Sequence, residues 1–274
     1  MDKKVVLITG ASSGMGKDAA LQLIKEGHIV YGAARRVELM QDIEKAGGHA
    51  IRLDVTNSDE IKMGVDRILK EHGRIDVLVN NAGYGLYGSV EEVSIEDAKR
   101  QFDVNIFGLA QITQAVIPQM RGRRSGKIIN ISSMGGKMYT PLGAWYHATK
   151  HALEGWSDCL RLELAQFGID VVIVEPGAIA TEFGDVMLDP MVKNSGNGPY
   201  KPLVDALAKS TKEMYSKKNA ASPSSVITNV ISKAIRSAKP KTRYRAGKWA
   251  KPMVWIRVNL GDRIFDKTVM SQIK

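Results

Sequence analysis

Short apolar runs alternate with longer amphipathic stretches along the first part of the chain, and this alternation limits the folds that are open to it. The runs are almost continuously apolar, which indicates strands buried on both faces of a parallel sheet. Their repetition predicts a single-domain, doubly wound, three-layer α/β fold. The runs cover Val5–Thr9, Ile29–Ala34, Ala50–Leu53, Val77–Val79, Lys127–Ser132 and Asp170–Glu175, and the stretches cover Met15–Glu26, Ser58–His72, Ser94–Met120 and Tyr146–Phe167.

The chain beyond Pro176 departs from this alternation. Residues 178–202 are predicted to be a loop, because Gly184, Pro190, Gly196, Gly198, Pro199 and Pro202 interrupt them. Apolar spacing then predicts helices over Leu203–Ser216 and Ser224–Ala238, an edge strand over Lys241–Ala246 and a surface helix within Trp249–Val269. No composition break separates this part, so we expect a helical extension of the same domain.

The formal net charge of +10 is concentrated in this later part of the chain. Residues 191–274 hold 18 Lys and Arg against 4 Asp and Glu, whereas residues 1–190 have a net charge of −4. Such a surface can be a solvated face, or it can contact anionic lipid or nucleic acid. The chain has no aromatic-interleaved RNA motif and no zinc-ligand spacing. Nucleic acid is therefore the least favoured partner, no metal site is expected, and peripheral contact with an anionic membrane stays open.

Three features of the sequence favour an intracellular, cytoplasmic protein. No apolar run approaches the roughly 18 residues of a membrane-spanning helix. The first apolar run, Val5–Ile8, is too short for the apolar part of a secretory signal. The single cysteine, Cys159, cannot form an internal disulfide, and its helical surroundings favour a packing role over a nucleophilic one.

A glycine-rich turn follows the first run and opens the first amphipathic stretch. It reads Thr9-Gly10-Ala11-Ser12-Ser13-Gly14-Met15-Gly16. Glycine lets the backbone turn tightly and approach a pyrophosphate, and the start of a helix offers free N–H groups to the phosphate oxygens. The turn thus predicts a dinucleotide site of the Rossmann type. Its G-x-x-x-G-x-G spacing differs from the G-x-G-x-x-G of many such sites, so a simple tight turn is the alternative.

An arginine pair follows the second run. Many NAD-binding proteins carry an acidic residue here that accepts hydrogen bonds from the adenosine ribose, whereas this chain has Arg35 and Arg36. Guanidinium groups suit a 2′-phosphate, so NADP(H) is favoured over NAD(H). A solvated arginine pair at the start of a helix is the alternative.

Residues after the third and fourth runs complete the candidate cofactor site. Asp54, followed by Val55, is a candidate partner for the adenine amino group. The segment Asn80-Asn81-Ala82-Gly83 is small enough at Ala82 and Gly83 for close approach to a cofactor. The amides of Asn80 and Asn81 suit cofactor contact and the bracing of neighbouring strands equally well.

Tyr146 and Lys150 form a candidate proton-transfer pair. They lie four residues apart in a helical stretch, so their side chains share a face. A phenol has a reference pKa of about 10, and a nearby ammonium lowers it by favouring the phenolate. The pair can thus act as a general acid or base near neutral pH. A Y-x-x-x-K pattern by itself is common, and most examples are surface tyrosines beside a lysine.

Other polar residues support the interpretation of this pair as a proton-transfer site. Ser133 follows the fifth run at the carboxyl edge of the predicted sheet, where its hydroxyl could hydrogen-bond a substrate carbonyl. Asn105 interrupts an apolar segment within Ser94–Met120, which indicates either a functional amide or an irregular helix. His147 points to a different helical face from Tyr146 and is interpreted as structural.

Taken together, these residues resemble the main group of the short-chain dehydrogenase/reductase family. The resemblance runs from about Val5 to Thr181. Its motifs are T-G-x-x-x-G-x-G at 9–16, Asn-Asn-Ala-Gly at 80–83, Asn105, Ser133, Y-x-x-x-K at 146–150, and Pro176-Gly177 leading through Ile179 to Thr181. The resemblance implies a Rossmann core over residues 1–190 that binds the dinucleotide and catalyses the reaction. Residues 191–274 would form a substrate lid and basic extension, in a homodimer or homotetramer.

The resemblance also implies a role for each catalytic residue. Tyr146 would exchange a proton with the carbonyl or alcohol oxygen, and Lys150 would bind the nicotinamide ribose and lower the tyrosine pKa. Ser133 would polarise the carbonyl, and Asn105 would hold a water that links Lys150 to solvent. Residues 176–181 would contact the nicotinamide, whose ring exchanges the hydride with the substrate carbon.

Within the family, the Arg35-Arg36 pair and residues 81–88 resemble the branch of 17β-hydroxysteroid and retinol dehydrogenases and acyl-dihydroxyacetone-phosphate reductase. That branch implies an apolar alcohol or ketone, which suits the apolar residues Met134, Met138, Leu142, Trp145, Phe183, Met187 and Leu188; such residues also serve simply as core. Met134, not the family's frequent glycine, follows the motif serine. The alternatives to a carbonyl reductase or alcohol dehydrogenase are a catalytically silent NADP(H)-binding protein and a different reaction, such as epimerisation or enoyl reduction.

Overall fold

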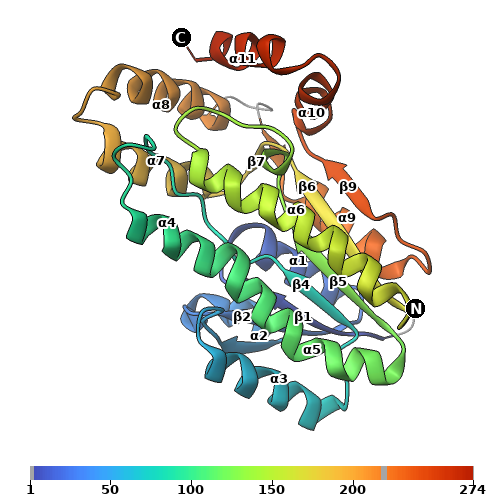
Figure 1. Cartoon of the computed structure of the whole chain (residues 1–274). Coiled ribbons are helices and arrows are strands. Elements are labelled where there is room, and N and C mark those ends of the chain that lie inside the picture. The colour runs from blue at the N-terminus through green and yellow to red at the C-terminus, as the bar shows by residue number, and fades with distance from the viewer. Residues whose placement is uncertain (1–2, 217–220, 274) are drawn as a thin grey trace.

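One seven-stranded sheet forms the centre of the molecule in the computed structural model, which describes residues 3–216 and 221–273 (Figure 1). Met1, Asp2, residues 217–220 and Lys274 lie outside the described residues. The strand order is β3-β2-β1-β4-β5-β6-β9, and all neighbours pair in parallel. The strands are β1 (Val5–Thr9), β2 (Ile29–Ala34), β3 (His49–Arg52), β4 (Val77–Asn80), β5 (Gly126–Ile131), β6 (Ile169–Pro176) and β9 (Arg243–Ala246).

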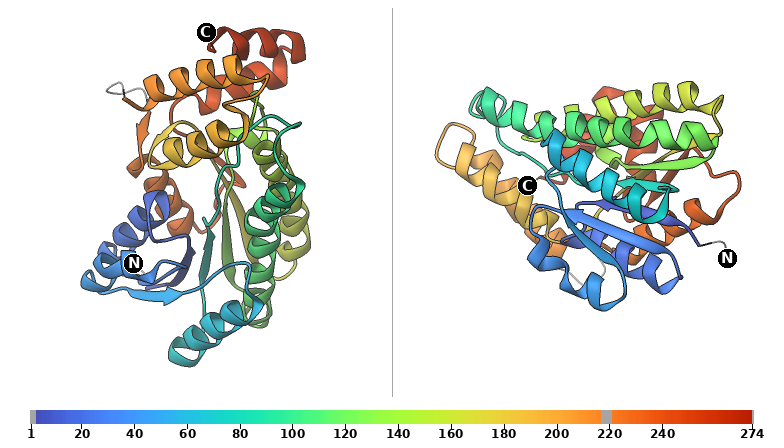
Figure 2. Two further views of the ribbon diagram at one scale, coloured as in Figure 1. Left: turned by 90° about the vertical axis from the view of Figure 1, so that its left-hand side faces the viewer. Right: turned by 90° about the horizontal axis from the view of Figure 1, so that it is seen from below.

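Helices cover both faces of this sheet (Figure 2). One apolar cluster joins the sheet to α1 (Gly14–Lys25), α2 (Gln41–Lys45) and α9 (Ser225–Arg236). A second cluster joins the opposite face to α3 (Ser58–His72), α5 (Leu109–Arg123) and α6 (Ala144–Ala165). Successive residues of β1 divide between the clusters, with Val6 and Ile8 in the first and Val5 and Leu7 in the second. The predicted doubly wound, three-layer α/β fold is therefore confirmed.

The predicted strands agree with the observed ones to within a residue or two at each end. This agreement follows from burial on both faces, which leaves few polar residues inside a strand. The predicted edge strand within Lys241–Ala246 is also confirmed, since β9 pairs with β6 only. Residues beyond 190 thus contribute a strand to the same sheet as the first strands of the chain.

The long helix predicted over Ser94–Met120 is divided in three. Ser94 begins α4 (Ile95–Phe102) by accepting a hydrogen bond from Asp97 N. A π-helical turn, η2 (Asp103–Gly108), contains Asn105, and α5 follows it. The irregularity indicated by Asn105 is therefore present, and π-turns of this kind are frequent at functional sites.

The loop predicted over residues 178–202 is wrong. A short strand, β7 (Ile179–Ala180), pairs with β8 (Ser222–Pro223), and Phe183–Ser195 forms helix α7 despite its internal Pro190. Met187, Leu188 and Met191 pack in one apolar cluster with Tyr146, so tertiary contacts outweigh the helix-breaking residues. Helix α8 (Lys201–Ser216) then begins two residues before its predicted start.

Several short helices differ from the expected boundaries. The 3₁₀ turn η1 (Val37–Met40) and α2 lie between β2 and β3, where no helix was expected. The predicted surface helix within Trp249–Val269 is two helices, α10 (Ala250–Asn259) and α11 (Asp262–Ser271). Gly261 separates them in the left-handed region at φ +77°. None of the helices in the described ranges is long and apolar enough to span a bilayer.

Candidate active site

The glycine turn lies where the strand order reverses, between the carboxyl ends of β1 and β4. Open α/β sheets bind ligands at such a position. Gly10 has φ +67°, and a Cβ there would lie 2.8 Å from the Cα of Ala82. Only glycine combines this backbone angle with so close an approach of the β4 loop. The turn therefore leaves the backbone open toward the carboxyl edge, as a phosphate-binding turn requires.

Thr9 and the two asparagines tie the β4 loop to its neighbours. The Thr9 hydroxyl accepts hydrogen bonds of 3.1 Å from the N–H groups of Asn81 and Ala82. Asn81 Nδ2 donates to the carbonyls of Thr9 and Gly10, each at 3.1 Å. Asn80 Nδ2 donates to Thr113 Oγ1 and Asn130 Oδ1, each at 2.9 Å. Cofactor contact and the bracing of neighbouring strands were both open for these amides. Their hydrogen bonds within the protein are those of bracing.

The start of α1 faces the same edge of the sheet. Ser13 occupies the N-cap position, and its side chain makes no capping hydrogen bond to the helix. Gly14 has φ +53°, and a Cβ there would lie 3.7 Å from the side chain of Thr181. The phosphate-binding turn, with Ser12, Ser13 and Met15, is thus brought next to the segment after β6. The hydroxyls of the half-buried Ser12 and Ser13 and the first N–H groups of the helix are suited to an anionic group.

Of the residues expected at the adenine end, Arg35 borders a cavity of about 850 Å³, whereas Arg36, Asp54 and Val55 do not line it. Arg35 lines it beside Thr56 and Phe107, and Arg35 and Arg36 are both exposed. In the described part of the chain neither guanidinium forms an ion pair. Asp54 Oδ1 accepts hydrogen bonds from the N–H and hydroxyl of Thr56 at 2.9 and 2.8 Å, and Val55 is buried against Gly108.

A second cavity, of about 230 Å³, brings together three of the four residues expected at the chemical end, whereas Asn105 does not line it. Its wall contains Ser133, Tyr146 and Lys150. The cofactor candidates Met15, Asn81, Gly83, Pro176, Gly177, Ile179 and Thr181 also line it. Residues from five separate parts of the sequence thus meet at one place, as the predicted active site requires.

Tyr146 is held among aromatic rings. It is 7% exposed, and its ring centroid lies 5.7 Å from that of Tyr87 and 5.5 Å from that of Phe183. Tyr87 precedes α4, whereas Phe183 begins α7. These contacts fix the ring plane from two sides, so the phenol has a defined direction at the cavity wall.

Lys150 is buried beneath the tyrosine. Its ammonium donates a 2.9 Å hydrogen bond to the carbonyl of Ile131 at the end of β5. Burial lowers the pKa of Lys150 to about 8, and the nearby carboxylate of Glu154 opposes this shift. The ammonium therefore stays charged at neutral pH, although with a smaller margin than a solvated lysine.

Asn105 connects the π-turn to two neighbouring segments. Its Oδ1 accepts a 3.1 Å hydrogen bond from Tyr84 N, and its Nδ2 donates to Tyr84 O at 3.0 Å and to Thr149 Oγ1 at 3.1 Å. A Cβ on Gly83 would lie 3.0 Å from Asn105 Oδ1 and 4.0 Å from Lys150 Nζ. The missing side chain of Gly83 thus leaves space between the amide and the ammonium.

Ser133 lies just beyond β5, at the start of the 3₁₀ turn η3 (Met134–Gly136). Its hydroxyl accepts a 3.0 Å hydrogen bond from Gly135 N, which directs the oxygen while leaving its proton free to donate. The hydroxyl of Ser132 is buried, with no hydrogen-bond partner among the described residues. Both serines line the cavity, but only the Ser133 hydroxyl is oriented by a hydrogen bond from the backbone.

The apolar part of the wall agrees in part with expectation. Met134, Met138, Phe183 and Met187 line the cavity. Leu142, Trp145 and Leu188 do not line it, and the two leucines belong to the apolar cluster around Tyr146 instead. His147 also lines the cavity, and so do residues for which no role was expected: Tyr84, Tyr87, Ile131, Ser132, Gly135, Thr140, Ala178, Leu207 and Thr211. Tyr84 could have been found from its position directly after Gly83, whereas Tyr87, Leu207 and Thr211 reach the wall without any motif.

His147 has a structural place in this wall. Its Nε2 accepts a 3.0 Å hydrogen bond from Thr140 N, so the proton of the neutral ring lies on Nδ1, which faces the carbonyl of Gly135 at 3.0 Å. Burial lowers its pKa to about 4. The neutral ring thereby joins the turn after β5 to α6, in agreement with the structural interpretation.

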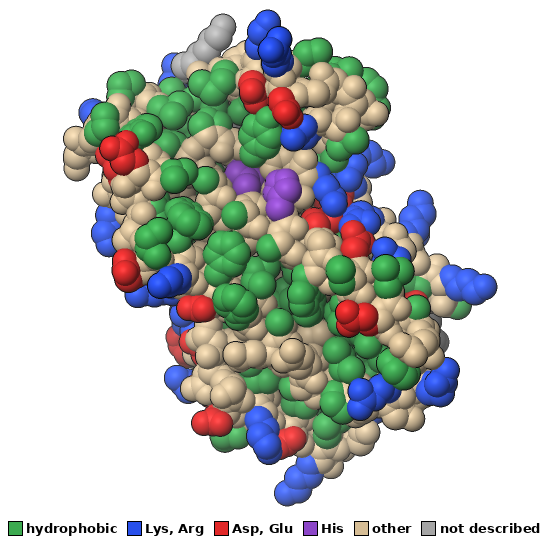
Figure 3. All heavy atoms as spheres, viewed as in Figure 1, with side chains coloured by type: hydrophobic (Ala, Val, Ile, Leu, Met, Phe, Trp, Pro, Cys, Tyr) green, Lys and Arg blue, Asp and Glu red, His purple; other side chains and the backbone are tan. Residues whose placement is uncertain are grey.

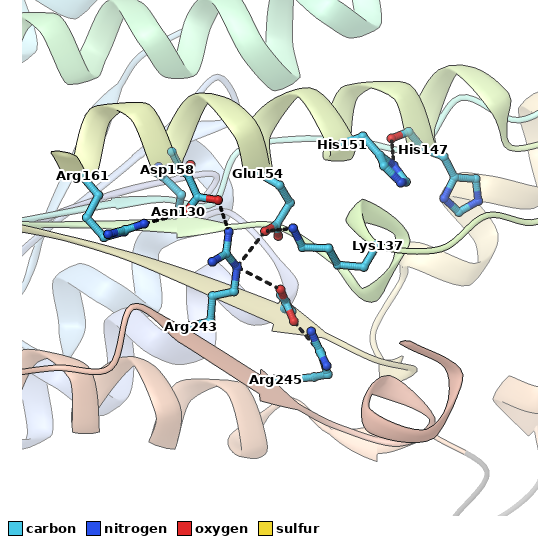
Figure 4. Close-up of polar contacts among 11 residues, drawn as sticks. Asn130, Lys137, His147, His151, Glu154, Asp158, Arg161, Arg243 and Arg245 are labelled. Carbon is cyan, nitrogen blue, oxygen red and sulfur yellow. Dashed lines mark hydrogen bonds and ion pairs between the residues drawn. The ribbon is translucent and has the colours of Figure 1, made fainter. Parts of the chain in front are cut away.

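A buried ion-pair network lies one helical turn beyond Lys150 (Figure 4). Glu154 is 2% exposed and pairs with Lys137 Nζ at 3.2 Å and Arg243 Nε at 3.1 Å. Arg243 also pairs with Asp158 and with the fully buried Glu175. The network connects the turn after β5 to α6, β6 and β9, and so holds the serine-bearing turn against the tyrosine-bearing helix.

The fold and site together define a Rossmann-type oxidoreductase. Over the residues that the structure describes, no group of three or more His, Cys, Asp or Glu side chains is arranged to hold a metal ion. The features that do converge are the end of the glycine turn at Met15 and a phenol, an ammonium and a hydroxyl at the carboxyl edge of a parallel sheet.

Comparison with known proteins identifies the family. Residues 4–192 match the short chain dehydrogenase family model. The chain is 45% identical over 185 residues to 3-ketodihydrosphingosine reductase of Bacteroides thetaiotaomicron, which covers 68% of this chain and 67% of that protein. A short-chain dehydrogenase from Streptomyces avermitilis superposes with a TM-score of 0.75 at 36% identity, covering 89% of this chain and 88% of the other. Serine dehydrogenase in complex with NADP⁺ gives a TM-score of 0.75 at 30% identity, covering 87% and 92%.

The chain belongs to the short-chain dehydrogenase/reductase family. It is an oxidoreductase of this family, whose members use a nicotinamide cofactor, bind small-molecule substrates and commonly form oligomers.

Proposed function

We propose that this protein is an NADP(H)-dependent oxidoreductase that interconverts a carbonyl and an alcohol on an apolar, steroid-, retinoid- or lipid-like substrate. The observation that carries the proposal is the composition of the smaller cavity. Ser133, Tyr146 and Lys150 lie on its wall together with methionine and phenylalanine side chains. The similarity to 3-ketodihydrosphingosine reductase, a name that denotes a long-chain ketone substrate, supports the apolar class.

The residues present fit a dinucleotide. The backbone at Gly10 and Gly14 has positive φ, and the Ser12 and Ser13 side chains stand at the start of α1. Thr9 supports the turn from beneath, with Gly10, Gly16, Asn81 and Ala82 packed around it. Arg35 and Arg36 would bind a 2′-phosphate, and Asp54 and Val55 would border the adenine. NADP-bound neighbours in the family support this choice of cofactor over NAD(H).

The chain's own residues then account for the proton transfer. When bound, the nicotinamide supplies a hydride to a carbonyl carbon or accepts one from an alcohol carbon. The Tyr146 hydroxyl gives its proton to the carbonyl oxygen during reduction. During oxidation the Tyr146 phenolate takes the proton of the alcohol. Lys150 favours the phenolate by its charge and would hold the ribose, and Ser133 donates a hydrogen bond that polarises the carbonyl. Asn105 would hold a water in the space beside Gly83, linking Lys150 to solvent.

The segments around the cavity have supporting roles in this proposal. Residues 176–181, including Pro176, Gly177, Ile179 and Thr181, would contact the nicotinamide. Residues 1–190 would form the cofactor-binding and catalytic core. Residues 191–274 would supply the substrate lid, to which Leu207 and Thr211 of α8 belong. We place the enzyme in the cytoplasm as a homodimer or homotetramer.

The experiment is a screen of NADPH-dependent reduction over long-chain, steroid, retinoid, aromatic and short aliphatic ketones, repeated with Tyr146→Phe. We expect turnover of apolar ketones, and a loss of about 10²-fold or more in the variant. NADPH affinity, measured by fluorescence titration, should be retained. Near-normal turnover by Tyr146→Phe would exclude the proposed proton donor. Tight NADPH binding without reduction of any carbonyl would instead identify a catalytically silent NADP(H)-binding protein.

A further inference from the structure

The outward surface of helices α10 and α11 carries an unusual concentration of exposed apolar side chains. Trp255 is 57% exposed and Val258 is 68% exposed, and they lie three residues apart on α10. Other exposed apolar residues in this region are Trp249, Leu260, Ile264 and Met270. Both tryptophans that are exposed in the described residues are in this set. We call these six residues and the basic residues between them the α10–α11 surface.

These side chains are not needed to attach the two helices to the protein. The opposite sides of the helices bear Ala250 and Val254 in α10 and Phe265 and Val269 in α11, all of them buried. Phe265 and Val269 pack with Met138, and Tyr139 stacks edge-on against Phe265 at 5.1 Å. Each helix therefore has one side that packs against the rest of the protein and one side whose apolar residues are exposed.

The outward side is basic as well as apolar. Lys251 lies one turn before Trp255, and Arg263 and Lys267 lie on α11 beside Ile264 and Met270; all three cations are exposed. The two acidic residues of α11 are exposed, and each has a partner: Asp262 pairs with Arg257 at 2.7 Å and Asp266 accepts a 2.9 Å hydrogen bond from Tyr139. Lys251, Arg257, Arg263 and Lys267 outnumber these two carboxylates, so the surface carries a net positive charge.

On the face drawn in Figure 3, hydrophobic side chains, Lys or Arg side chains and Asp or Glu side chains all reach the surface at the end of the molecule where α11 lies. Tryptophan prefers the headgroup level of a bilayer, where its apolar ring and polar N–H are both accommodated. Lysine and arginine beside it attract anionic lipid headgroups. An apolar partner alone would not account for the positive charge, and an acidic polar partner alone would not account for the two tryptophans.

We propose that the α10–α11 surface docks on the anionic headgroup surface of a lipid bilayer. The inference stands independently of the proposed reaction. It has a consequence for that reaction, because α10 and α11 pack against Met134 and Met138, which line the catalytic cavity. A docked molecule would hold one wall of its cavity close to the lipid.

The test measures binding of the full chain to vesicles by sedimentation. Vesicles of phosphatidylcholine alone are compared with vesicles that also contain phosphatidylglycerol, at low and at high salt. We expect binding to the anionic vesicles at low salt and its loss at high salt, where the charge attraction is screened. Brominated lipid should quench part of the tryptophan fluorescence, because Trp249 and Trp255 would reach the acyl boundary.

A matched pair of variants assigns the binding to this surface. Lys251→Glu with Trp255→Ser should weaken binding by about tenfold or more. Met63→Ser with Lys70→Glu makes the same kinds of change on exposed residues of α3, at the opposite end of the molecule (Figure 1), and should bind as the unaltered chain does. Circular dichroism checks that both variants are folded.

Three outcomes would overturn the proposal. The first is no sedimentation with anionic vesicles at low salt. The second is an equal loss of binding in the α3 variant. The third is an α10 variant that binds vesicles normally but changes from a larger to a smaller species in light scattering, which would make this surface an interface between copies of the chain.

Discussion

The ammonium of Lys150 lies 5.9 Å from the centre of the Tyr146 ring while it donates a 2.9 Å hydrogen bond to the carbonyl of Ile131. The helix that carries both side chains is thereby fastened to the end of β5, the strand that leads into Ser133. The hydrogen bond holds the tyrosine-bearing helix against the strand that leads to the serine-bearing turn. In the proposed mechanism the ammonium would also stabilise a phenolate by its charge.

Changing Glu154 should alter the pH dependence of turnover. The Glu154 carboxylate opposes the lowering of the Lys150 pKa by burial, so Glu154→Gln should lower that pKa below about 8. Turnover that requires the ammonium would then decline at a lower pH than in the unaltered enzyme. The measurement is kcat at saturating substrate between about pH 6 and 10.

Asp158→Asn is the control for this change. Asp158 also pairs with Arg243, but its side chain is 35% exposed and it lies a further turn along α6 from Lys150. Superimposable pH profiles for Glu154→Gln and the unaltered enzyme would show that the carboxylate does not tune the ammonium. An equal shift in Asp158→Asn would assign the effect to the network as a whole.

Removing the arginine pair should weaken the binding of NADPH but not that of NADH. Arg35→Asp with Arg36→Ala should weaken NADPH binding by about 10²-fold, because charge-assisted hydrogen bonds to a phosphate contribute about 1.5–3 kcal/mol each. NADH, which lacks the 2′-phosphate, should bind with little change. Dissociation constants for both cofactors are measured by fluorescence, with the exposed Arg67→Ala as control. Equal losses for NADPH and NADH would refute the 2′-phosphate assignment.

Acid should destabilise the protein through His147. Burial lowers the pKa of this ring from 6.5 to about 4, so the unfolded chain binds more protons than the folded protein between these values. The free energy of unfolding should therefore fall as the pH falls through this window, by up to about 3 kcal/mol. Urea unfolding at several pH values measures the slope. His147→Gln should be less stable at neutral pH but should lose most of this acid dependence.

The exposed His151 gives a comparison for His147. His151 lies one turn further along the same helix, and its ring Nδ1 lies 2.9 Å from the backbone carbonyl of His147. His151→Gln should keep the acid dependence of the unaltered protein. If His147→Gln keeps the same slope, another group is responsible for the acid sensitivity.

A methyl group on Gly10 should damage the cofactor site. Gly10→Ala would place a Cβ 2.8 Å from the Cα of Ala82 in a backbone conformation with φ +67°, which costs about 1–3 kcal/mol. The displaced turn should bind NADPH more weakly. Gly155→Ala is the matched control, because Gly155 lies within α6 with nothing near its added Cβ, and this change should stabilise the protein by about 0.5–1 kcal/mol. If Gly10→Ala binds NADPH as tightly as the unaltered protein, the turn does not contribute to phosphate binding.

Local pattern was sufficient to predict the sheet and much of the candidate site. The buried strands and α3 are visible in the sequence, since a strand covered on both faces is continuously apolar and α3 begins at an Asn57 cap and ends at Gly73. The Tyr146–Lys150 pair needs only helical spacing.

Tyr87 and Leu207 could not be found in this way, because each reaches the cavity through packing between segments distant in sequence. Helix α7 was missed for the same reason, as its core contacts outweigh Gly184 and Pro190.

The pairing of β9 with β6 has a consequence for the order of folding. β9 is completed only at Ala246, about 70 residues after β6 ends at Pro176, although the two strands are neighbours. During synthesis the valine-rich β6 therefore leaves the ribosome well before its outer partner. Until then, its free backbone groups form an open strand edge that can pair with another chain. A fragment cut after residue 190 would keep the whole glycine turn and Tyr146, yet would be prone to aggregation along that edge.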